Sequence, residues 1–476
     1  MRLTTFATFG LALGLLIGGC ASSKTKPDES KTAESSDEAA EEGAEGDEKA
    51  LEFRAKAPAA KKIGEEDGVK AYRIGKLTVL HKPTPANEVV SAKLYIDGGV
   101  ANLDEKTAGI ENLALRTAVN GGTESTPKDE FTSTLNSMGS SVSAFTERDY
   151  SGYTLRSIVK HFDKSWELFI EAMLEPAMPK DELTTQRKKQ LAEIDQISEN
   201  PNRLVSVLAR KQIAKSHPYR HLQLGTRENV ESFEREQVLA YQRELLNPAR
   251  MLLVVVGDIP TKKVIKKARA SLGRLVAEEW ERPKLPKLES PKTELAGEKK
   301  GIPTNYILGL FPAPEPEAKD YPAMKLALAY LSDRLFEEVR TKRNLSYAVA
   351  SGLSTHRANS GYLYVSAKQP NKTLKVMFDE VDKLKQEKLN KKQLQRTRNV
   401  FITEHYMGLE TNSNQASSLA RAELIEGDWK KHAEFLDEIK SVTPAQVKKA
   451  ANAYMKTYQF GVVGSPDKVK PASVSK

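Results

Sequence analysis

Residues able to bind a metal or act as nucleophiles are few in this sequence. The chain of 476 residues has one cysteine, Cys20, and seven histidines. His217 and His221 have the four-residue spacing of two zinc-binding imidazoles on a helix, but Pro218 lies between them and predicts a loop. Glu404-His405 lies in a predicted helix without a second histidine in register. The sequence has no G-x-S-x-G, phosphate-binding loop or dinucleotide-binding motif. These residues alone therefore predict no complete catalytic site.

Residues 108–123, AGIENLALRTAVNGGT, predict a short buried helix. Thr107 is the expected N-cap, and Ile110 and Leu113 begin an apolar stripe at helical spacing. Gly121 and the glycine after it predict the end of the helix.

This segment resembles the opening helix of the insulinase (pitrilysin) family of zinc metallopeptidases, which carries H-x-x-E-H. Counted from Gly109, the two histidine positions fall on Asn112 and Arg116, and the glutamate position falls on Leu115. Asparagine is a poor zinc ligand, arginine repels the cation, and leucine cannot accept a proton from water. The resemblance implies a third ligand 77 residues after the second histidine position, which is Glu193. A single carboxylate does not hold catalytic zinc, so we expect no metal on this chain. Glu193 could equally be an ordinary helix-surface residue paired with a lysine.

A second resemblance lies in residues 335–347, LFEEVRTKRNLSY, which are similar to the Arg…Gly-Leu-x-Tyr segment of the same family. The resemblance implies that Arg340 anchors a peptide and that the Tyr347 hydroxyl binds the scissile carbonyl and its developing oxyanion. Asn344 stands where glycine is usual, and asparagine tolerates the left-handed backbone fairly well. The alternative is that both residues are retained for packing.

The elements that must position these residues occur twice. Alternating or continuous apolar residues predict strands at 77–80, 90–96, 142–146, 150–158 and 251–257. The second half repeats the first at a shift of about 210 residues; Gly152-Tyr153, for example, recurs as Gly361-Tyr362. We predict an α+β fold of two tandem units, each a sheet with helices packed on one face. The resemblance implies units of the insulinase (LuxS/MPP-like) type.

The amino terminus predicts export. Arg2 precedes an apolar run, and Ile17-Gly-Gly-Cys20 resembles a bacterial lipobox, in which Cys20 is lipidated. The alternative is an ordinary signal peptide with an incidental cysteine. Because no aspartate follows Cys20, the resemblance to sorted lipoproteins implies the outer membrane, facing the periplasm. The predicted organisation is a signal peptide at 1–20, a disordered acidic linker at 21–66, an N-terminal unit at 67–280, a linker at 281–300 and a C-terminal unit at 301–476.

Charge is unevenly distributed along the chain. The formal net charge is +9, and residues 1–50 hold five Lys/Arg and ten Asp/Glu, so the remainder is strongly basic. A basic body attracts anionic membranes, acidic peptides or nucleic acid. Lysines are scattered, with no basic stripe interleaved with aromatic residues and no nucleic-acid-binding motif, so we expect no nucleic-acid partner.

The family resemblance implies a catalytically incomplete, lipid-anchored peptidase subunit, because some bacterial members of the family divide the zinc motif and the Arg/Tyr pair between two chains. By this resemblance the chain would supply Arg340 and Tyr347 to a zinc-bearing subunit of the same family, in a heterodimer or larger assembly that cleaves unfolded peptides. Zinc is then expected on the partner. One alternative is a peptide-binding or scaffold lipoprotein without a peptidase role, and another is an independent metallopeptidase with an unrecognised metal site.

Overall fold

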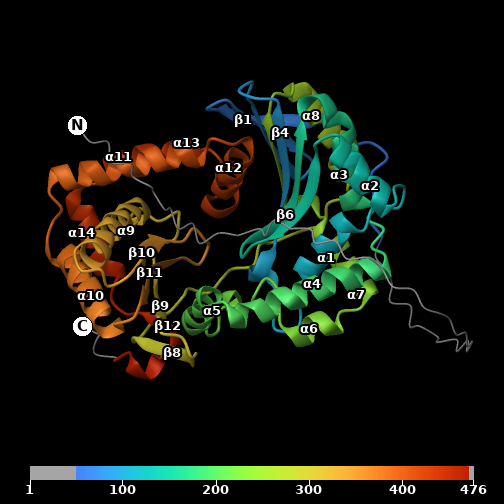
Figure 1. The fold of residues 1–476 in the computed structure, drawn as a ribbon. Coiled ribbons are helices and arrows are strands. Elements are labelled where there is room, and N and C mark those ends of the chain that lie inside the picture. The colour runs from blue at the N-terminus through green and yellow to red at the C-terminus, as the bar shows by residue number, and fades with distance from the viewer. Residues whose placement is uncertain (1–49, 471–476) are drawn as a thin grey trace, which may run out of the picture. The chain divides into compact units, whose positions relative to one another are not determined.

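Two sheets organise residues 50–470, which the computed structural model describes (Figure 1). The predicted signal peptide, Cys20 and the linker up to residue 49 lie outside the described residues. Within residues 50–470 the first sheet has seven strands in the order β1-β2-β3-β7-β4-β6-β5, and the second has five in the order β10-β11-β9-β12-β8. The strands are β1 (Ala60–Glu66), β2 (Val69–Ile74), β3 (Leu77–Pro83), β4 (Val89–Asp97), β5 (Ser141–Thr146), β6 (Tyr150–Ile158), β7 (Met251–Gly257), β8 (Glu294–Lys299), β9 (Asn305–Pro312), β10 (Ala348–Leu353), β11 (Ser360–Ala367) and β12 (Gln459–Gly464).

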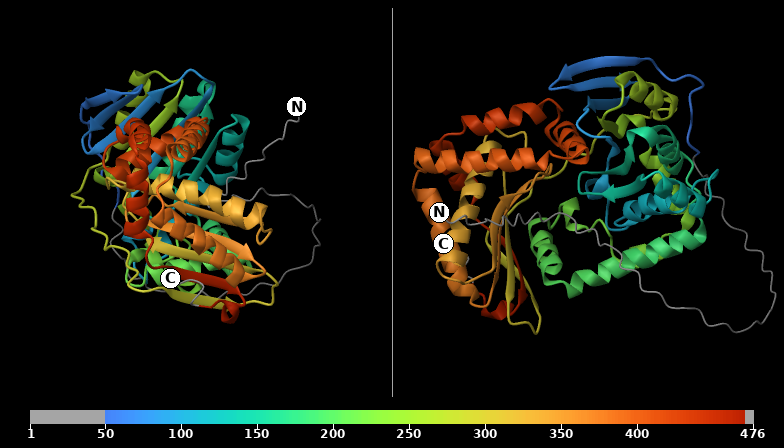
Figure 2. Two further views of the ribbon diagram at one scale, coloured as in Figure 1. Left: turned by 90° about the vertical axis from the view of Figure 1, so that its left-hand side faces the viewer. Right: turned by 45° about the horizontal axis from the view of Figure 1, so that its top comes forward.

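Helices pack against both sheets (Figures 1 and 2). In the first half they are α1 (Ile110–Asn120), α2 (Lys128–Ser137), α3 (Phe162–Leu174), α4 (Lys180–Glu199), α5 (Pro201–Ile213), α6 (Arg227–Ser232), α7 (Arg235–Leu245) and α8 (Thr261–Ala270). In the second half they are α9 (Tyr321–Leu335), α10 (Pro370–Gln386), α11 (Lys391–Gly408), α12 (Asn412–Glu426), α13 (Lys431–Ser441) and α14 (Pro444–Tyr454).

The repeat predicted from the sequence is confirmed by strand order. The first sheet contains β3-β7-β4-β6-β5, and the second contains the equivalent series β8-β12-β9-β11-β10. In each series one outer pair is parallel, β3 with β7 and β8 with β12, and the other pairs are antiparallel. The first sheet differs by the added hairpin of β1 and β2. The fold is therefore α+β and is built from two tandem units, as predicted.

Each unit also contributes one helix to the sheet of the other. Helix α5 packs Leu204, Val205 and Ala209 against Leu308 and Val463 of the second sheet. Helix α12, 211 residues later, packs its apolar residues against β3, β4 and β7 of the first sheet. Most of the remaining helices line the two main apolar cores, on the opposite faces of the sheets. Strand β7, MLLVVVG, is therefore buried along its whole length, which explains its continuous apolar sequence.

The structure differs from the sequence predictions at two points. Thr107 is not the N-cap of α1; the cap is Gly109, whose φ of 99° turns the chain, and Thr107 instead binds Asp104 through its hydroxyl. A Cβ at Gly109 would lie 2.8 Å from the Leu224 carbonyl oxygen, so glycine is required there. Residues 60–66, predicted as linker, form β1, because backbone pairing with β2 at a sheet edge requires few apolar side chains.

Two further segments bear on the sequence analysis. The predicted linker 281–300 includes β8, the edge strand beside β12. In the part of the chain from residue 50 to 470, no helix is long and apolar enough to cross a membrane.

Candidate functional site

The residues at the family's metal positions lie together at the contact of α1 with α4. Arg116 makes a bidentate ion pair with Glu193: Nη1 lies 2.9 Å from Oε1, and Nη2 lies 3.1 Å from Oε2. Leu115 is 1% exposed and belongs to the apolar core of the first unit. Asn112 is buried, and its Oδ1 has no hydrogen-bond partner in the described structure. The two positions that the family spacing relates, Arg116 and Glu193, therefore lie side by side, and the guanidinium holds the carboxylate.

Helix α4 is fixed against α1 one turn before Glu193. The Gln190 side chain is fully buried and donates to two backbone carbonyls, Gly109 at 3.0 Å and Leu224 at 2.8 Å. These bonds join the start of α1, helix α4 and the loop after residue 221. The contact between Arg116 and Glu193 is thus set by buried backbone anchoring and does not depend on the ion pair alone.

The donor set at this position does not fit zinc. A catalytic zinc site uses three protein ligands drawn from histidine, cysteine and carboxylates. Here Glu193 is the single carboxylate, it is engaged by Arg116, and Asn112 offers a neutral amide. Across residues 50–470, no group of three or more His, Cys, Asp or Glu is arranged to hold a metal. Glu193 is paired, as one sequence interpretation expected, but with an arginine of α1 and not with a lysine.

A neighbouring acid, Glu111, was not identified from the sequence. Its side chain is fully buried, Oε1 accepts from the Gly99 amide at 2.8 Å, and Oε2 accepts from the Tyr241 hydroxyl at 2.7 Å. Burial, followed by the charge of Glu111, raises the pKa of Tyr241 well above its ordinary value, so the phenol remains a donor. Glu111 therefore has a structural role in tying α1 to α7, and no sequence pattern marks it.

His217 and His221, which the sequence predicts to lie in a loop and not on a zinc-binding helix, do lie in a loop. His217 precedes a short 3₁₀ turn, and its Nδ1 accepts from the Tyr219 amide at 3.0 Å. Burial lowers the pKa of His217 to about 4. Pro218 opens that turn, so His217 and His221 are not on one helical face. The loop interpretation is confirmed.

Tyr219 belongs to a buried polar contact between the two units that sequence reasoning missed. Asp149, in the β5–β6 turn, accepts from the Tyr219 hydroxyl, and its Oδ2 lies 3.1 Å from His356 Nδ1 in the β10–β11 loop. Burial opposes ionisation of Asp149, but the bond from His356 and its charge outweigh it and lower the pKa of the carboxyl. These residues are far apart in sequence, so no local motif could have predicted their contact.

The segment that carries Arg340 and Tyr347 lies partly at the surface, and the Arg340 side chain is half-buried. Helix α9 is followed by one π-helical turn, Phe336–Thr341, a geometry often found at functional sites. Asn344 has φ 49°, so it adopts the left-handed conformation expected where the family has glycine. The side chain of Tyr347 is 81% exposed. The Arg340 guanidinium carbon lies 4.9 Å from the centre of the Phe336 ring and 5.8 Å from that of Tyr347.

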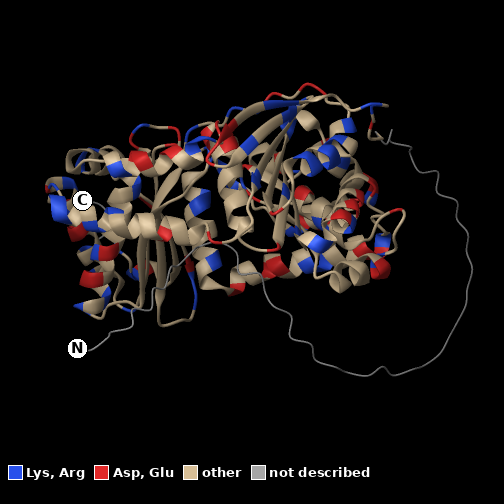
Figure 3. Ribbon diagram, turned by 90° about the horizontal axis from the view of Figure 1, so that it is seen from above, with Lys and Arg blue, Asp and Glu red and all other residues tan. Residues whose placement is uncertain are grey.

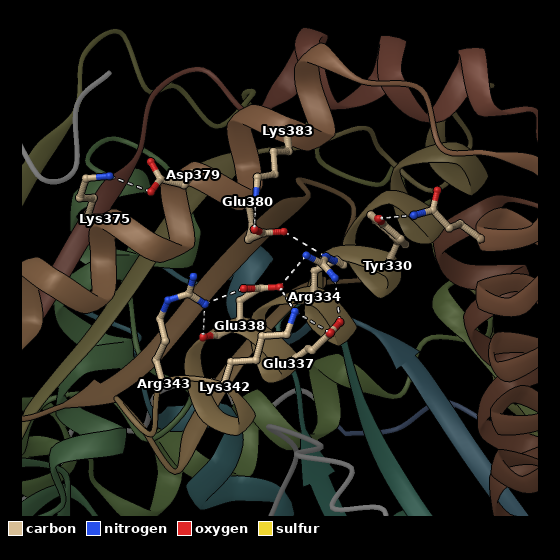
Figure 4. Close-up of polar contacts among 11 residues, drawn as sticks. Tyr330, Arg334, Glu337, Glu338, Lys342, Arg343, Lys375, Asp379, Glu380 and Lys383 are labelled. Atoms are coloured by element: carbon tan, nitrogen blue, oxygen red, sulfur yellow. Dashed lines mark hydrogen bonds and ion pairs between the residues drawn. The ribbon is translucent and has the colours of Figure 1, made fainter.

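An ion-pair network links residues on both sides of Arg340 in the sequence (Figure 4). Glu338 is buried and accepts from Arg334 at 2.8 Å, from Lys342 at 2.7 Å and from Arg343 at 2.5 Å. Arg334 also binds Glu380 of α10 at 3.0 Å. The bonds from Lys342 and then Arg343 lower the pKa of Glu338 to about 2. The network therefore joins both ends of the turn that carries Arg340 to α9 and α10.

Charges elsewhere on the fold are mixed. Figure 3 shows Lys and Arg interspersed with Asp and Glu over elements of both units.

Comparison with known proteins finds similarity to the insulinase family over most of the chain. A family model described as insulinase (peptidase family M16) matches residues 78–226, and one described as the peptidase M16 inactive domain matches residues 232–401. An uncharacterized zinc protease of Streptomyces coelicolor is 24% identical over 420 residues, covering 84% of this chain and 90% of the relative. The uncharacterized zinc protease YmxG of Bacillus subtilis is 23% identical, covering 68% of this chain and 81% of its own.

Solved structures share the fold. A peptidase M16 inactive-domain protein from Pseudomonas fluorescens has a TM-score of 0.74 at 20% identity and covers 83% of this chain and 97% of its own. The periplasmic protease PqqL of Escherichia coli has a TM-score of 0.73 at 12% identity, covering 89% of this chain and 48% of its own. At these identities the likeness concerns the fold alone.

Proposed function

Because the chain belongs to the insulinase family (peptidase family M16), we propose that it is a zinc-less peptidase subunit that completes the active site of a zinc-bearing partner. One observation carries the proposal. At the family's metal positions the Glu193 carboxylate is occupied by its ion pair with Arg116. In the segment 335–347, by contrast, Tyr347 is 81% exposed beside Arg340. A packing role does not require an exposed tyrosine.

The chemistry of the pair suits peptide binding. A guanidinium donates several hydrogen bonds in one plane, so Arg340 would hold a peptide carbonyl or carboxylate. The Tyr347 hydroxyl would donate to the carbonyl oxygen of the bond being cleaved, where negative charge develops. The rings of Phe336 and Tyr347 flank Arg340 and restrict its guanidinium, which reduces the entropy lost when a peptide binds. Zinc and its activated water would belong to the partner.

Export and lipidation complete the proposal. Cys20 would carry the lipid, residues 21–49 would form part of a tether, and the folded body would face the periplasm and act on unfolded peptides. The curated relatives are named zinc proteases, and one protein of the same fold is named a periplasmic protease. Both names are compatible with this assignment and neither describes this chain.

The test is whether this chain and a zinc-bearing partner hydrolyse a peptide only when they are mixed. The purified chain, a partner carrying H-x-x-E-H, and their mixture are assayed on a quenched fluorescent peptide, with zinc measured in each. We expect hydrolysis by the mixture alone, no zinc on this chain, and at least a ~100-fold loss of kcat in Tyr347→Phe, the usual scale for one oxyanion donor. Arg340→Ala should raise KM as well.

Matched variants control for surface changes. Tyr406→Phe alters another exposed tyrosine, 59% exposed on α11, and Arg396→Ala alters an exposed arginine on the same helix. Neither should change hydrolysis. Zinc together with hydrolysis by the isolated chain would refute the proposal in favour of an independent peptidase. Peptide binding without activity in any mixture would favour a scaffold lipoprotein.

A further inference from the structure

A pocket of about 240 Å³ lies in the second unit, among α9, α11, α12 and α13. None of its lining residues belongs to the Arg116 and Glu193 contact or to the Arg340 and Tyr347 segment. Pockets for drug-sized ligands span ~300–1,000 Å³, so this one is limited to a ligand about the size of an amino acid. The proposal below does not depend on the peptidase role.

One side of the pocket is aromatic. Phe435 of α13 lies between Tyr321 of α9 and Phe401 of α11, with its ring centre 6.1 Å from each of theirs. This spacing is typical of interacting rings. The three rings provide an apolar wall suited to an aliphatic or aromatic side chain.

The rest of the lining carries charges of both signs that are not directly paired. Arg421 donates to the Ser418 hydroxyl at 3.4 Å, Lys325 to the Leu353 carbonyl at 3.2 Å, and Lys431 to the Glu426 carbonyl at 2.5 Å. Within residues 50–470, neither the Arg421 guanidinium nor the Glu426 carboxylate is in an ion pair of 4.0 Å or less. A guanidinium has five N–H donors, so most of the donors of Arg421 remain available to a ligand.

Glu426 lies in the field of these cations. The pKa of its carboxyl is raised, because burial outweighs the opposing charges of Arg421, Lys431 and Lys325. The pocket therefore holds a carboxylate near three cations without a direct bond between them. Glu404, at an exposed position of α11, supplies a second acid to the lining.

Two histidines add neutral polar groups. His432 Nδ1 lies 2.9 Å from the Ser418 hydroxyl, and the His405 and His432 rings are 6.4 Å apart. Burial lowers the pKa of His432 to about 4 and also lowers that of His405, with Arg421 adding to the effect on His405. At neutral pH both rings are uncharged, so they contribute hydrogen bonds without competing with Arg421 for an anion.

We propose that this pocket binds a free α-amino acid with an apolar side chain. Arg421 and Ser418 would take the α-carboxylate, Glu426 would take the α-ammonium, and Tyr321, Phe401 and Phe435 would contact the side chain. The combination of an available guanidinium, an unpaired acid and an aromatic wall in a small pocket matches these three parts of the ligand. A solely anionic ligand would leave Glu426 opposed to it, and an apolar ligand would leave both charges unsatisfied.

The test is isothermal titration of the full chain with L-phenylalanine and two analogues. Phenethylamine lacks the carboxylate, and 3-phenylpropionate lacks the ammonium. We expect one binding site for L-phenylalanine at micromolar to low-millimolar Kd, and at least tenfold weaker binding of each analogue. Arg421→Gln and Glu426→Gln should each weaken L-phenylalanine binding at least tenfold. Because the analogues use the unaltered chain, the test stands even if a variant fails to fold.

Two exposed residues outside the pocket provide matched controls. Arg396→Gln on α11 and Glu434→Gln on α13 should bind L-phenylalanine as the unaltered chain does. Binding of 3-phenylpropionate as tightly as L-phenylalanine would overturn the assignment in favour of an anion site. If folded protein gives no heat of binding with L-phenylalanine at concentrations up to about tens of millimolar, the assignment is overturned altogether. Neither result would bear on activity with a zinc-bearing partner.

Discussion

The substitution Glu338→Gln tests whether the ion-pair network around the π-helical turn that carries Arg340 stabilises the fold. Glu338 is 6% exposed and accepts bonds from Arg334, Lys342 and Arg343, all of which require its charge for full strength. Glutamine keeps the shape and removes the charge. The cations would then be left around a neutral amide; Arg334 would keep its ion pairs with Glu337 and Glu380, and Lys342 its pair with Glu337.

The expected magnitude follows from the pKa. A carboxyl whose pKa falls from its ordinary 4.5 to about 2 on folding contributes roughly 3.5 kcal/mol at neutral pH, at about 1.4 kcal/mol per pH unit. Lys342 and Arg343 are 50% and 43% exposed, so solvent screens the network. We therefore expect Glu338→Gln to lower the free energy of unfolding by about 1–2 kcal/mol at pH 7.

The sign of the pH dependence is fixed by the direction of the shift. Because the folded pKa lies below the unfolded value, the stabilisation is complete above about pH 4.5 and is lost as pH falls through about 2. The difference between the unaltered chain and Glu338→Gln should therefore shrink to less than half by about pH 3. Well below about pH 2, Glu338 is protonated in the folded state and is as neutral as glutamine.

The assay is urea unfolding followed by circular dichroism at pH 7 and pH 3. Glu337→Gln is the matched control, because Glu337 binds Arg334 and Lys342 too but is 46% exposed, and it should change stability by less than about 0.5 kcal/mol. Equal effects of the two substitutions, or a Glu338→Gln effect of the same size at both pH values, would contradict the reasoning.

Two further predictions concern the metal positions and the contact between units. Replacing both Asn112 and Arg116 with histidine places two imidazoles four residues apart on α1 and frees the Glu193 carboxylate. The double variant should therefore bind one zinc ion per chain, measured by elemental analysis. Adding Glu193→Gln should abolish this binding. Single Asn112→His should bind none, because Arg116 still holds the carboxylate; zinc binding by it would show that the ion pair does not close the site. Gly461→Ala should lower the melting temperature by several degrees, since its Cβ would lie 2.4 Å from the Val205 carbonyl oxygen of α5, while Gly408→Ala, which has nothing within 4 Å, should be neutral or stabilising. An unchanged melting temperature in Gly461→Ala would mean that α5 and β12 do not approach this closely.

The sequence by itself determined the internal repeat and many of the helices and strands. Through the family spacing it also related Arg116 to Glu193. Apolar periodicity marked α1 and the continuous strand β7, because the spacing of buried side chains is a local property. The recurrence of Gly152-Tyr153 at Gly361-Tyr362 indicated two equivalent sheets, and their strand orders agree. Family spacing related Arg116 to Glu193, which the structure joins.

Only the tertiary structure decided what those residues contact. It showed that Arg116 holds Glu193 through both oxygens, that Glu111 and Asp149 are buried and hydrogen bonded, and that α5 and α12 each cover the sheet of the other unit. These contacts join segments that can be more than three hundred residues apart; Lys93 of β4 and Ser417 of α12, for example, are separated by 324 residues. Their energies depend on burial and on distances between side chains, and neither quantity is encoded in local periodicity or composition.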